Sequence, residues 1–307
     1  MRRLMLVANP AASGFTQSLH GDVIRILEEG YRVYAPWPDS PEQALAASRQ
    51  AAHIGYDVVV AMGGDGTAHT VANGIHGSPT ALSVIPSGTT NVLARLLGLG
   101  NRPRQAARTI LTADGATRSF PTLRLYIEHP DGIATRIATF AAGIGYDADA
   151  ISESERSPLG KVGMGSIHYA RSALRVASRY RNRLPTLRVA DGETTSDVVG
   201  LIVQAHDELT YIGRQAIRLG PPPGPLALTV DRMGVGLAVS LAGLGFLRVR
   251  LDRLRGVRLW RDFTSIRVDA EPEALVEADG EVLGQATAIT ITPEPAGLVV
   301  VDTAQKS

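Results

Sequence analysis

The sequence predicts a two-domain protein, with an N-terminal parallel α/β (Rossmann-like) domain followed by a C-terminal β-sandwich domain. Up to about residue 117, short apolar runs alternate with helical segments, and repeated strand–helix units of this length form parallel sheets with helices on both faces. Beyond that point, most segments have the pattern of strands joined by turns such as Asp131-Gly132. The 307 residues are enough for two domains that each bury a core.

The first domain, residues 1–117, is expected to contain four strands and four helices. The strands are Leu4–Ala8, Tyr31–Ala35, Asp57–Ala61 and Ala81–Ile85. The helices are Gln17–Glu29, Pro41–Ile54, Ala68–Ile75 and Asn91–Leu97. Ser40 and Pro41 are typical of a helix start, and the run Val58–Val60 is typical of a strand buried in a parallel sheet.

The second domain is expected over residues 118–292 and is mainly β. Its expected strands are Arg118–Glu128, Ala134–Ala142, Thr186–Val189, Val198–Ala205, Ala227–Val230, Ser265–Asp269 and Ala288–Thr292. One long helical pattern, Ile167–Arg181, interrupts these strands.

Composition excludes several classes of function. The formal net charge of +1 gives no reason to expect nucleic acid as a partner. The absence of cysteine excludes disulfides, cysteine nucleophiles and thiolate zinc sites. The apolar stretch Val235–Leu247 is shorter than the ~20 residues of a spanning helix, and Met1–Ala8 is too short for a secretory signal. We therefore expect a soluble, cytoplasmic protein.

A glycine-rich turn, Gly63-Gly64-Asp65-Gly66-Thr67, follows the third predicted strand and precedes a helix. Glycines free the backbone to approach a ligand closely, and amides at a helix N-terminus bind phosphate. A carboxylate in such an anion-binding turn needs a cation partner, so Asp65 suggests magnesium or a base for an incoming hydroxyl. The alternative is a plain strand-to-helix turn.

Two further loops are expected at the same edge of the sheet. Ser87, Gly88, Thr89 and Asn91 follow the fourth strand, and the loop Asn9–Gly14 follows the first. Ligands bind at the carboxyl edge of open α/β sheets. The alternative for the second turn is simple helix capping by its Ser, Thr and Asn side chains.

These motifs resemble, in order, the signatures of the diacylglycerol kinase catalytic family. The N-terminal ones are Asn9-Pro10 with Ser13-Gly14, the turn at residues 63–67, and Pro86, Gly88-Thr89 and Asn91. Ala141–Ala148, Gly160–Tyr169 and Asp279-Gly280-Glu281 resemble later motifs of the same family. The resemblance covers essentially the whole chain. The family includes bacterial lipid kinases and sphingosine and ceramide kinases, and NAD kinases share its glycine-rich turn.

The resemblance implies that the first domain binds ATP, that the second supplies the acceptor pocket, and that transfer occurs in a cleft between them. It also implies that the tail, about residues 293–307, packs back on the first domain. Asp65 would act in catalysis and bind Mg²⁺, and Glu281 would deprotonate the acceptor hydroxyl. The implied nucleotide-binding residues are Asn9, Pro10, Ser13, Gly63, Gly64, Gly66, Thr67, Ser87, Gly88, Thr89 and Asn91.

The chain departs from the family pattern at three acidic positions. Thr70 and Pro121 stand where the family commonly has acidic residues, and Leu219–Leu226 replaces a segment that normally holds an Asp-Gly pair. The leading hypothesis is an ATP-dependent kinase of diacylglycerol or a similar lipid alcohol. The alternative is a catalytically weak or inactive kinase-fold protein that binds lipid or nucleotide.

Arg171, Arg175 and Arg179 repeat every four residues along one face of a predicted helix. Such a face suits peripheral contact with an anionic membrane; a solvated surface with ion pairs is the alternative. Exposed sheet edges also make a homodimer an expectation.

Overall fold

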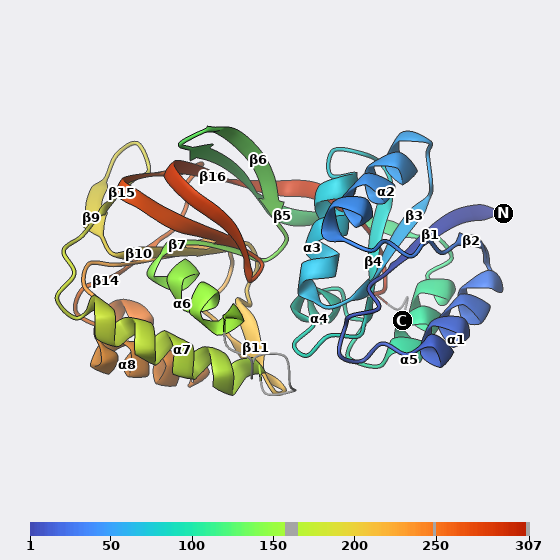
Figure 1. Ribbon diagram of the computed structural model, residues 1–307, viewed down its shortest axis with the longest axis horizontal. Helices are drawn as coiled ribbons and strands as arrows, with labels where there is room; N and C mark the ends of the chain where they lie inside the picture. The colour runs from blue at the N-terminus through green and yellow to red at the C-terminus, as the bar shows by residue number, and fades with distance from the viewer. Residues whose placement is uncertain (157–164, 248–249, 305–307) are drawn as a thin grey trace. The chain divides into compact units, whose positions relative to one another are not determined.

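The computed structural model of the chain describes residues 1–156, 165–247 and 250–304 (Figure 1). The chain divides into two units, Met1–Pro121 with Pro295–Ser307, and Thr122–Glu294. The boundaries expected from the sequence lie four residues earlier at the first junction and two residues earlier at the second.

The first unit has the expected parallel sheet. Its strands lie in the order β2-β1-β3-β4, and every neighbouring pair is parallel. The strands are β1 (Arg2–Ala8), β2 (Tyr31–Tyr34), β3 (Val58–Gly63) and β4 (Ala81–Pro86). All six residues of β3 are buried, as the apolar run predicted. The end of the long strand β16 (Glu281–Val301) joins this sheet beside β4, where Val300 pairs with Leu82.

Helices cover both faces of this sheet (Figure 1). They are α1 (Gln17–Glu28), α2 (Pro41–His53), α3 (Asp65–Ile75), α4 (Val92–Leu96) and α5 (Pro103–Thr112). Helix α2 packs against α3, and α1 packs against α5. The expected start of α2 is confirmed, because the Ser40 hydroxyl accepts a hydrogen bond from the Gln43 amide. Helix α5 had not been predicted.

The second unit is built from antiparallel strands, as expected. The main order is β14-β13-β10-β7-β15-β16, with β5, β6, β8 and β9 paired at its margins. Their bounds are β5 (Thr117–His129), β6 (Gly132–Ala138), β7 (Ala141–Gly145), β8 (Leu187–Ala190), β9 (Thr195–Val198), β10 (Gly200–Gln204), β13 (Leu226–Val230), β14 (Val257–Trp260) and β15 (Ile266–Ala278). A separate hairpin joins β11 (Thr210–Ile212) and β12 (Gln215–Ile217). The strands enclose a core that includes Leu125, Ile144, Val203 and Val276.

The second unit also contains more helix than the sequence predicted. Helix α7 (Gly165–Tyr180) coincides with the one helical pattern found there, but α6 (Tyr146–Glu155) and α8 (Val235–Phe246) were not expected. A short 3₁₀ turn, η2 (Leu251–Arg253), follows α8. The family-like segment Gly160–Tyr169 lies partly outside the described residues. Within the part of the chain that the structure describes, no helix combines the length and hydrophobicity needed to cross a bilayer.

Candidate functional site: converging turns and a buried acid pair

The first glycine-rich turn joins β3 directly to α3. Gly63 ends the strand and Gly64 is the N-cap of the helix. A Cβ on Gly63 would lie 2.2 Å from the Thr67 hydroxyl oxygen, so a side chain at that position is excluded. The amides of the first helical turn have no acceptor within the helix, and the helix dipole favours an anion there. This turn can therefore bind phosphate.

The second turn lies directly against the first. The Ser87 amide donates to the Gly63 carbonyl at 2.9 Å. A Cβ on Gly88 would lie 2.6 Å from the Cα of Gly64, so the two turns touch through their backbones. This contact requires glycine at position 88, whereas a Cβ on Gly64 would lie 3.4 Å from the Cα of Gly88, an ordinary contact distance. The two turns thus form one continuous backbone surface at the carboxyl edge of the sheet.

The loop after β1 completes the same cluster. The Asn9 side chain donates to the Thr67 hydroxyl at 3.2 Å and accepts from the Ala11 amide at 2.9 Å. The Gly14 amide donates to the Ser87 carbonyl at 2.8 Å. All three predicted loops therefore meet. Pro10, Ser13 and Thr89, which are also predicted nucleotide-binding residues of these loops, are exposed.

Asn91 and Ser87 have structural surroundings that the sequence did not reveal. The Asn91 carboxamide accepts from the Gly88 amide at 3.0 Å and donates to the Gly88 carbonyl at 2.8 Å. Asn91 is buried and has a positive φ of 50°, so its side chain shapes the turn. Ser87 is also buried, and within the described residues its hydroxyl has no hydrogen-bond partner.

Asp65 occupies the first position of α3 and links it to α4. One of its carboxylate oxygens accepts from the Leu93 amide at 3.1 Å. Among the described residues, no group of three or more acidic or histidine side chains could hold a metal ion by itself. Proteins commonly bind Mg²⁺ through one or two carboxylates together with substrate phosphates. A single carboxylate beside a phosphate-binding turn fits that pattern.

The Asp279-Gly280-Glu281 motif forms the β15–β16 hairpin of the second unit. Ala278 pairs with Glu281, and the two turn residues Asp279 and Gly280 both have positive φ, 56° and 86°, as a two-residue type I′ hairpin requires. Glu281 is exposed at the start of β16. It belongs to the second unit, whereas the converging turns belong to the first.

The buried carboxylate of Asp279 holds this hairpin in place. It accepts hydrogen bonds from the Thr139 amide at 2.7 Å, the Thr139 hydroxyl at 2.9 Å, and the amides of Phe140 and Ala141 at 2.9 and 3.2 Å. Bonds of this charge-assisted kind are among the stronger ones in proteins. Within this motif, Asp279 therefore has a structural role: it fixes the hairpin and with it the position of Glu281 on the second unit.

A pair of carboxyl groups, the half-buried Asp147 and the buried Glu277, was missed in the sequence. A Cβ on Gly143 would lie 2.9 Å from an oxygen of each acid, so both converge over this glycine. The Tyr169 hydroxyl donates to Asp147 at 2.7 Å, and the Gly280 amide donates to Glu277 at 3.0 Å. Asp147 belongs to the family-like segment Ala141–Ala148, but nothing near Glu277 marks it as its partner.

The environment of the two acids favours a protonated Glu277 beside an ionised Asp147. Burial, and next the charge of Asp147, raise the pKa of Glu277 well above its usual range. Burial also raises the pKa of Asp147, but hydrogen bonds from Tyr169 and Glu277 act in the opposite direction. Asp147 lies in the first turn of α6, where the helix dipole favours the charged form.

This pair predicts a pH-dependent stability. Because the pKa of Glu277 is higher in the folded chain than its value near 4.5 in an unfolded one, the contribution of Glu277 to the free energy of unfolding falls as pH rises above about 4.5, by up to about 1.4 kcal/mol per pH unit. Glu277→Gln keeps a neutral donor and removes this titration. The stability of the variant relative to the wild type should therefore increase between pH 4.5 and 7, as measured by denaturant unfolding.

Glu273→Gln is the matched control for this prediction, because Glu273 is an exposed glutamate of the same strand. Its effect on the unfolding free energy should be constant over the same pH range. A Glu277→Gln variant whose relative stability does not change with pH would show that Glu277 is ionised in the folded protein.

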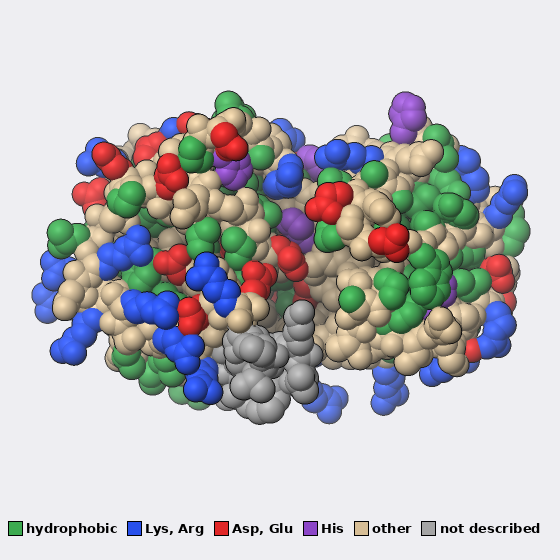
Figure 2. Space-filling view, viewed as in Figure 1, with side chains coloured by type: hydrophobic (Ala, Val, Ile, Leu, Met, Phe, Trp, Pro, Cys, Tyr) green, Lys and Arg blue, Asp and Glu red, His purple; other side chains and the backbone are tan. Residues whose placement is uncertain are grey.

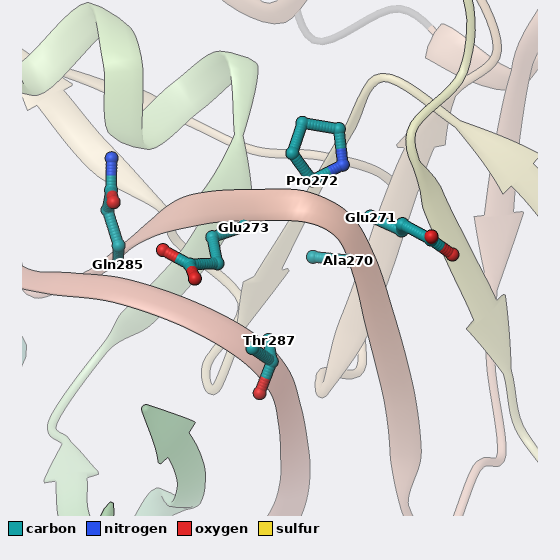
Figure 3. A pocket seen from close by; sticks show the side chains of 6 residues that line it. All are labelled: Ala270, Glu271, Pro272, Glu273, Gln285 and Thr287. Carbon is teal, nitrogen blue, oxygen red and sulfur yellow. The ribbon is translucent and has the colours of Figure 1, made fainter. Parts of the chain in front are cut away.

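A hollow of about 650 Å³ lies elsewhere on the second unit, where β15 bends between Asp269 and Ala274. Its lining residues are Ala270, Glu271, Pro272, Glu273, Gln285 and Thr287. Figure 3 shows the two glutamates pointing to opposite sides of the bend. The lining has two carboxylates and no basic side chain, so it does not suit a phosphate.

Comparisons with known proteins agree with the motifs. Residues 3–124 match the family described as "Diacylglycerol kinase catalytic domain", which confirms the resemblance for that part of the chain. A diacylglycerol kinase from Staphylococcus aureus is 35% identical over 104 residues. That match covers 33% of this chain and 33% of the relative, so the chain matches about a third of the length of this relative.

Solved structures extend the likeness of fold to nearly the whole chain. A diacylglycerol kinase from Bacillus anthracis superposes with a TM-score of 0.68 at 16% identity, covering 98% of this chain and 97% of that one. An NAD kinase from Archaeoglobus fulgidus, solved in complex with ATP, superposes with a TM-score of 0.54 at 15% identity, covering 98% and 94%. At these identities the likeness concerns the fold, and the predicted fold class is confirmed.

Proposed function

We propose that this protein is an ATP-dependent lipid kinase, which transfers the γ-phosphoryl group of ATP to a hydroxyl of diacylglycerol or a similar lipid alcohol. The observation that carries this proposal is the contact between the turns at Gly64 and Gly88. The amides of the first turn, at the N-terminus of α3, can donate to one polyphosphate. The second turn holds the first in place, because its Ser87 and Gly88 amides are bonded within the protein. The family match over residues 3–124 supports phosphoryl transfer as the chemistry.

In this proposal, the protein acts mainly by positioning charged groups. Amides of Gly64, Gly66 and Thr67 bind the phosphates, and Asn9 holds the Thr67 side chain in place through its 3.2 Å hydrogen bond. Asp65 would hold Mg²⁺, which neutralises phosphate charge when bound. Glu281, exposed on the second unit, would accept the proton of the acceptor hydroxyl.

The test is turnover by the purified full chain. Protein, labelled ATP, Mg²⁺ and vesicles containing diacylglycerol should give a labelled phospholipid, and omission of any one component should abolish the product. Ceramide, sphingoid bases and monoacylglycerol, assayed in parallel, define the acceptor. No labelled lipid from any of these alcohols, at protein concentrations that bind ATP, would exclude the kinase activity.

The second candidate is a weak or inactive kinase-fold protein that binds nucleotide or lipid. This candidate is favoured by Thr70, which stands at a position where the family commonly has a carboxylate. The Thr70 hydroxyl instead donates to the Gly66 carbonyl at 3.0 Å. Thr70→Glu distinguishes the two candidates. If the wild type is inactive and Thr70→Glu is active, the missing acid explains the inactivity. If the wild type phosphorylates a lipid alcohol, the second candidate is excluded.

A further inference from the structure

Helix α8 has one face that packs on the second unit. Ala238 is buried, and Leu237 and Leu241 are partly buried against a cluster that includes Val176 and Leu228. These contacts fix the helix against α7 and the sheet. These contacts cover only about half of the circumference of the helix.

The opposite face of α8 is apolar and exposed. Val235 is 44% exposed and Val239 is 54% exposed; because they are four residues apart, they lie on the same face. Ala242 and Gly243 continue this face and are also exposed. Leu247, directly after the helix, is 67% exposed. Between residues 233 and 247 the sequence has no charged residue.

The sequence around this apolar face has more basic than acidic residues. From residue 231 to residue 262 the chain has seven arginines and three acidic residues, Asp231, Asp252 and Asp262. Asp252 forms an ion pair with Arg250 at 2.5 Å. Arg232, immediately before the helix, and Arg253, in the adjoining 3₁₀ turn, are both exposed. An apolar face is therefore bordered by positive charge at both ends of α8.

Helix α7 lies beside α8 (Figure 1). Figure 2 shows hydrophobic side chains along the edge of the unit where Figure 1 draws α8, next to the basic side chains over α7. The arginines of α7 are partly balanced, because Arg175 and Arg179 form ion pairs with Glu153 at 2.9 and 3.0 Å. They can add to a cationic border, but the apolar contact surface lies on α8.

We infer that the exposed face of α8 lies in the interfacial region of an anionic phospholipid bilayer. The helix is about 18 Å long and about 10 Å wide, which gives a face of about 200 Å², well below the ~800 Å² per partner of a stable protein interface. A bilayer requires no such area, since apolar side chains insert among acyl chains while arginines meet lipid phosphates. The inference goes beyond the proposed function and does not depend on phosphoryl transfer.

Vesicle sedimentation with the full chain tests this inference. Vesicles of phosphatidylcholine with about one third phosphatidylglycerol should bind the protein at least tenfold more tightly than vesicles of phosphatidylcholine alone. The double variant V235D/V239D should lose at least tenfold in affinity for the anionic vesicles, because two carboxylates would enter the apolar region. Arg232→Gln should lose about fivefold, the effect of ~1 kcal/mol for one arginine near the surface.

Ile133→Asp is the matched control, because Ile133 is 63% exposed on β6 of the same unit. It should bind vesicles as the wild type does, and all variants should keep the circular dichroism spectrum and melting temperature of the wild type. Equal binding by V235D/V239D and the wild type would overturn the inference, as would a wild type that ignores anionic vesicles. A wild-type dimer that V235D/V239D dissociates would also overturn it, because a second copy would then cover α8.

Discussion

Asp65→Asn is expected to lower the kcat of lipid phosphorylation at least about hundredfold, with little change in the melting temperature. The substitution removes one negative charge but keeps a side-chain oxygen that can accept the Leu93 amide, now 3.1 Å away. The link between α3 and α4 is therefore retained. Removal of one preorganised oxyanion-hole donor costs about 10²–10³ in kcat, and we expect a comparable loss when the charge of Asp65 is removed. Steady-state kinetics with labelled ATP and diacylglycerol vesicles measure the effect.

Asp57→Asn is the control for that experiment. Asp57 precedes the same strand, β3, at its opposite end, and its carboxylate also accepts a backbone amide, that of Arg3, at 2.7 Å. Its kcat should remain within about twofold of the wild type, because only the carboxyl edge of a parallel sheet is placed for ligands. A full rate in Asp65→Asn would remove this residue from the mechanism and leave the amides as the functional part of the turn.

The parts of the fold that could be predicted are those with a local signal. The run Val58–Val60 indicated a buried parallel strand, and Ser40 with Pro41 indicated a helix start; both are confirmed. The convergence of the loops after β1, β3 and β4 also followed, because carboxyl ends of parallel strands meet at one edge. In these places the local sequence pattern and the sheet topology predict the same structure.

The elements that were missed lack such a signal. Helix α8 has apolar residues on all sides, so no 3.6-residue period distinguishes it from a buried strand. The Asp147–Glu277 pair depends on the antiparallel register in which Glu277 lies opposite Gly143, which no local pattern encodes. Asn91 was predicted to bind nucleotide from its motif, but only the fold shows that its carboxamide is engaged by Gly88.

Gly88→Ala tests whether the two touching turns act as one site. The new Cβ would lie 2.6 Å from the Gly64 Cα and 3.0 Å from the Asn91 side-chain oxygen. The hydrogen bond from the Ser87 amide to the Gly63 carbonyl, at 2.9 Å, holds the two turns together, so the clash cannot be relieved by a side-chain rotation. We expect a loss of about 1–3 kcal/mol in unfolding free energy and at least a tenfold weaker affinity for a non-hydrolysable ATP analogue.

Gly21→Ala supplies the comparison, because a Cβ on Gly21, within α1, would meet no atom within 4 Å. Replacing a helical glycine should stabilise the protein by roughly 0.5–1 kcal/mol and leave nucleotide affinity unchanged. Denaturant unfolding and calorimetric titration distinguish the two variants. A Gly88→Ala variant that lost stability but bound the analogue like the wild type would contradict this prediction. Separating the turns must move any phosphate that contacts both of them, so the phosphates would then have to bind to amides elsewhere.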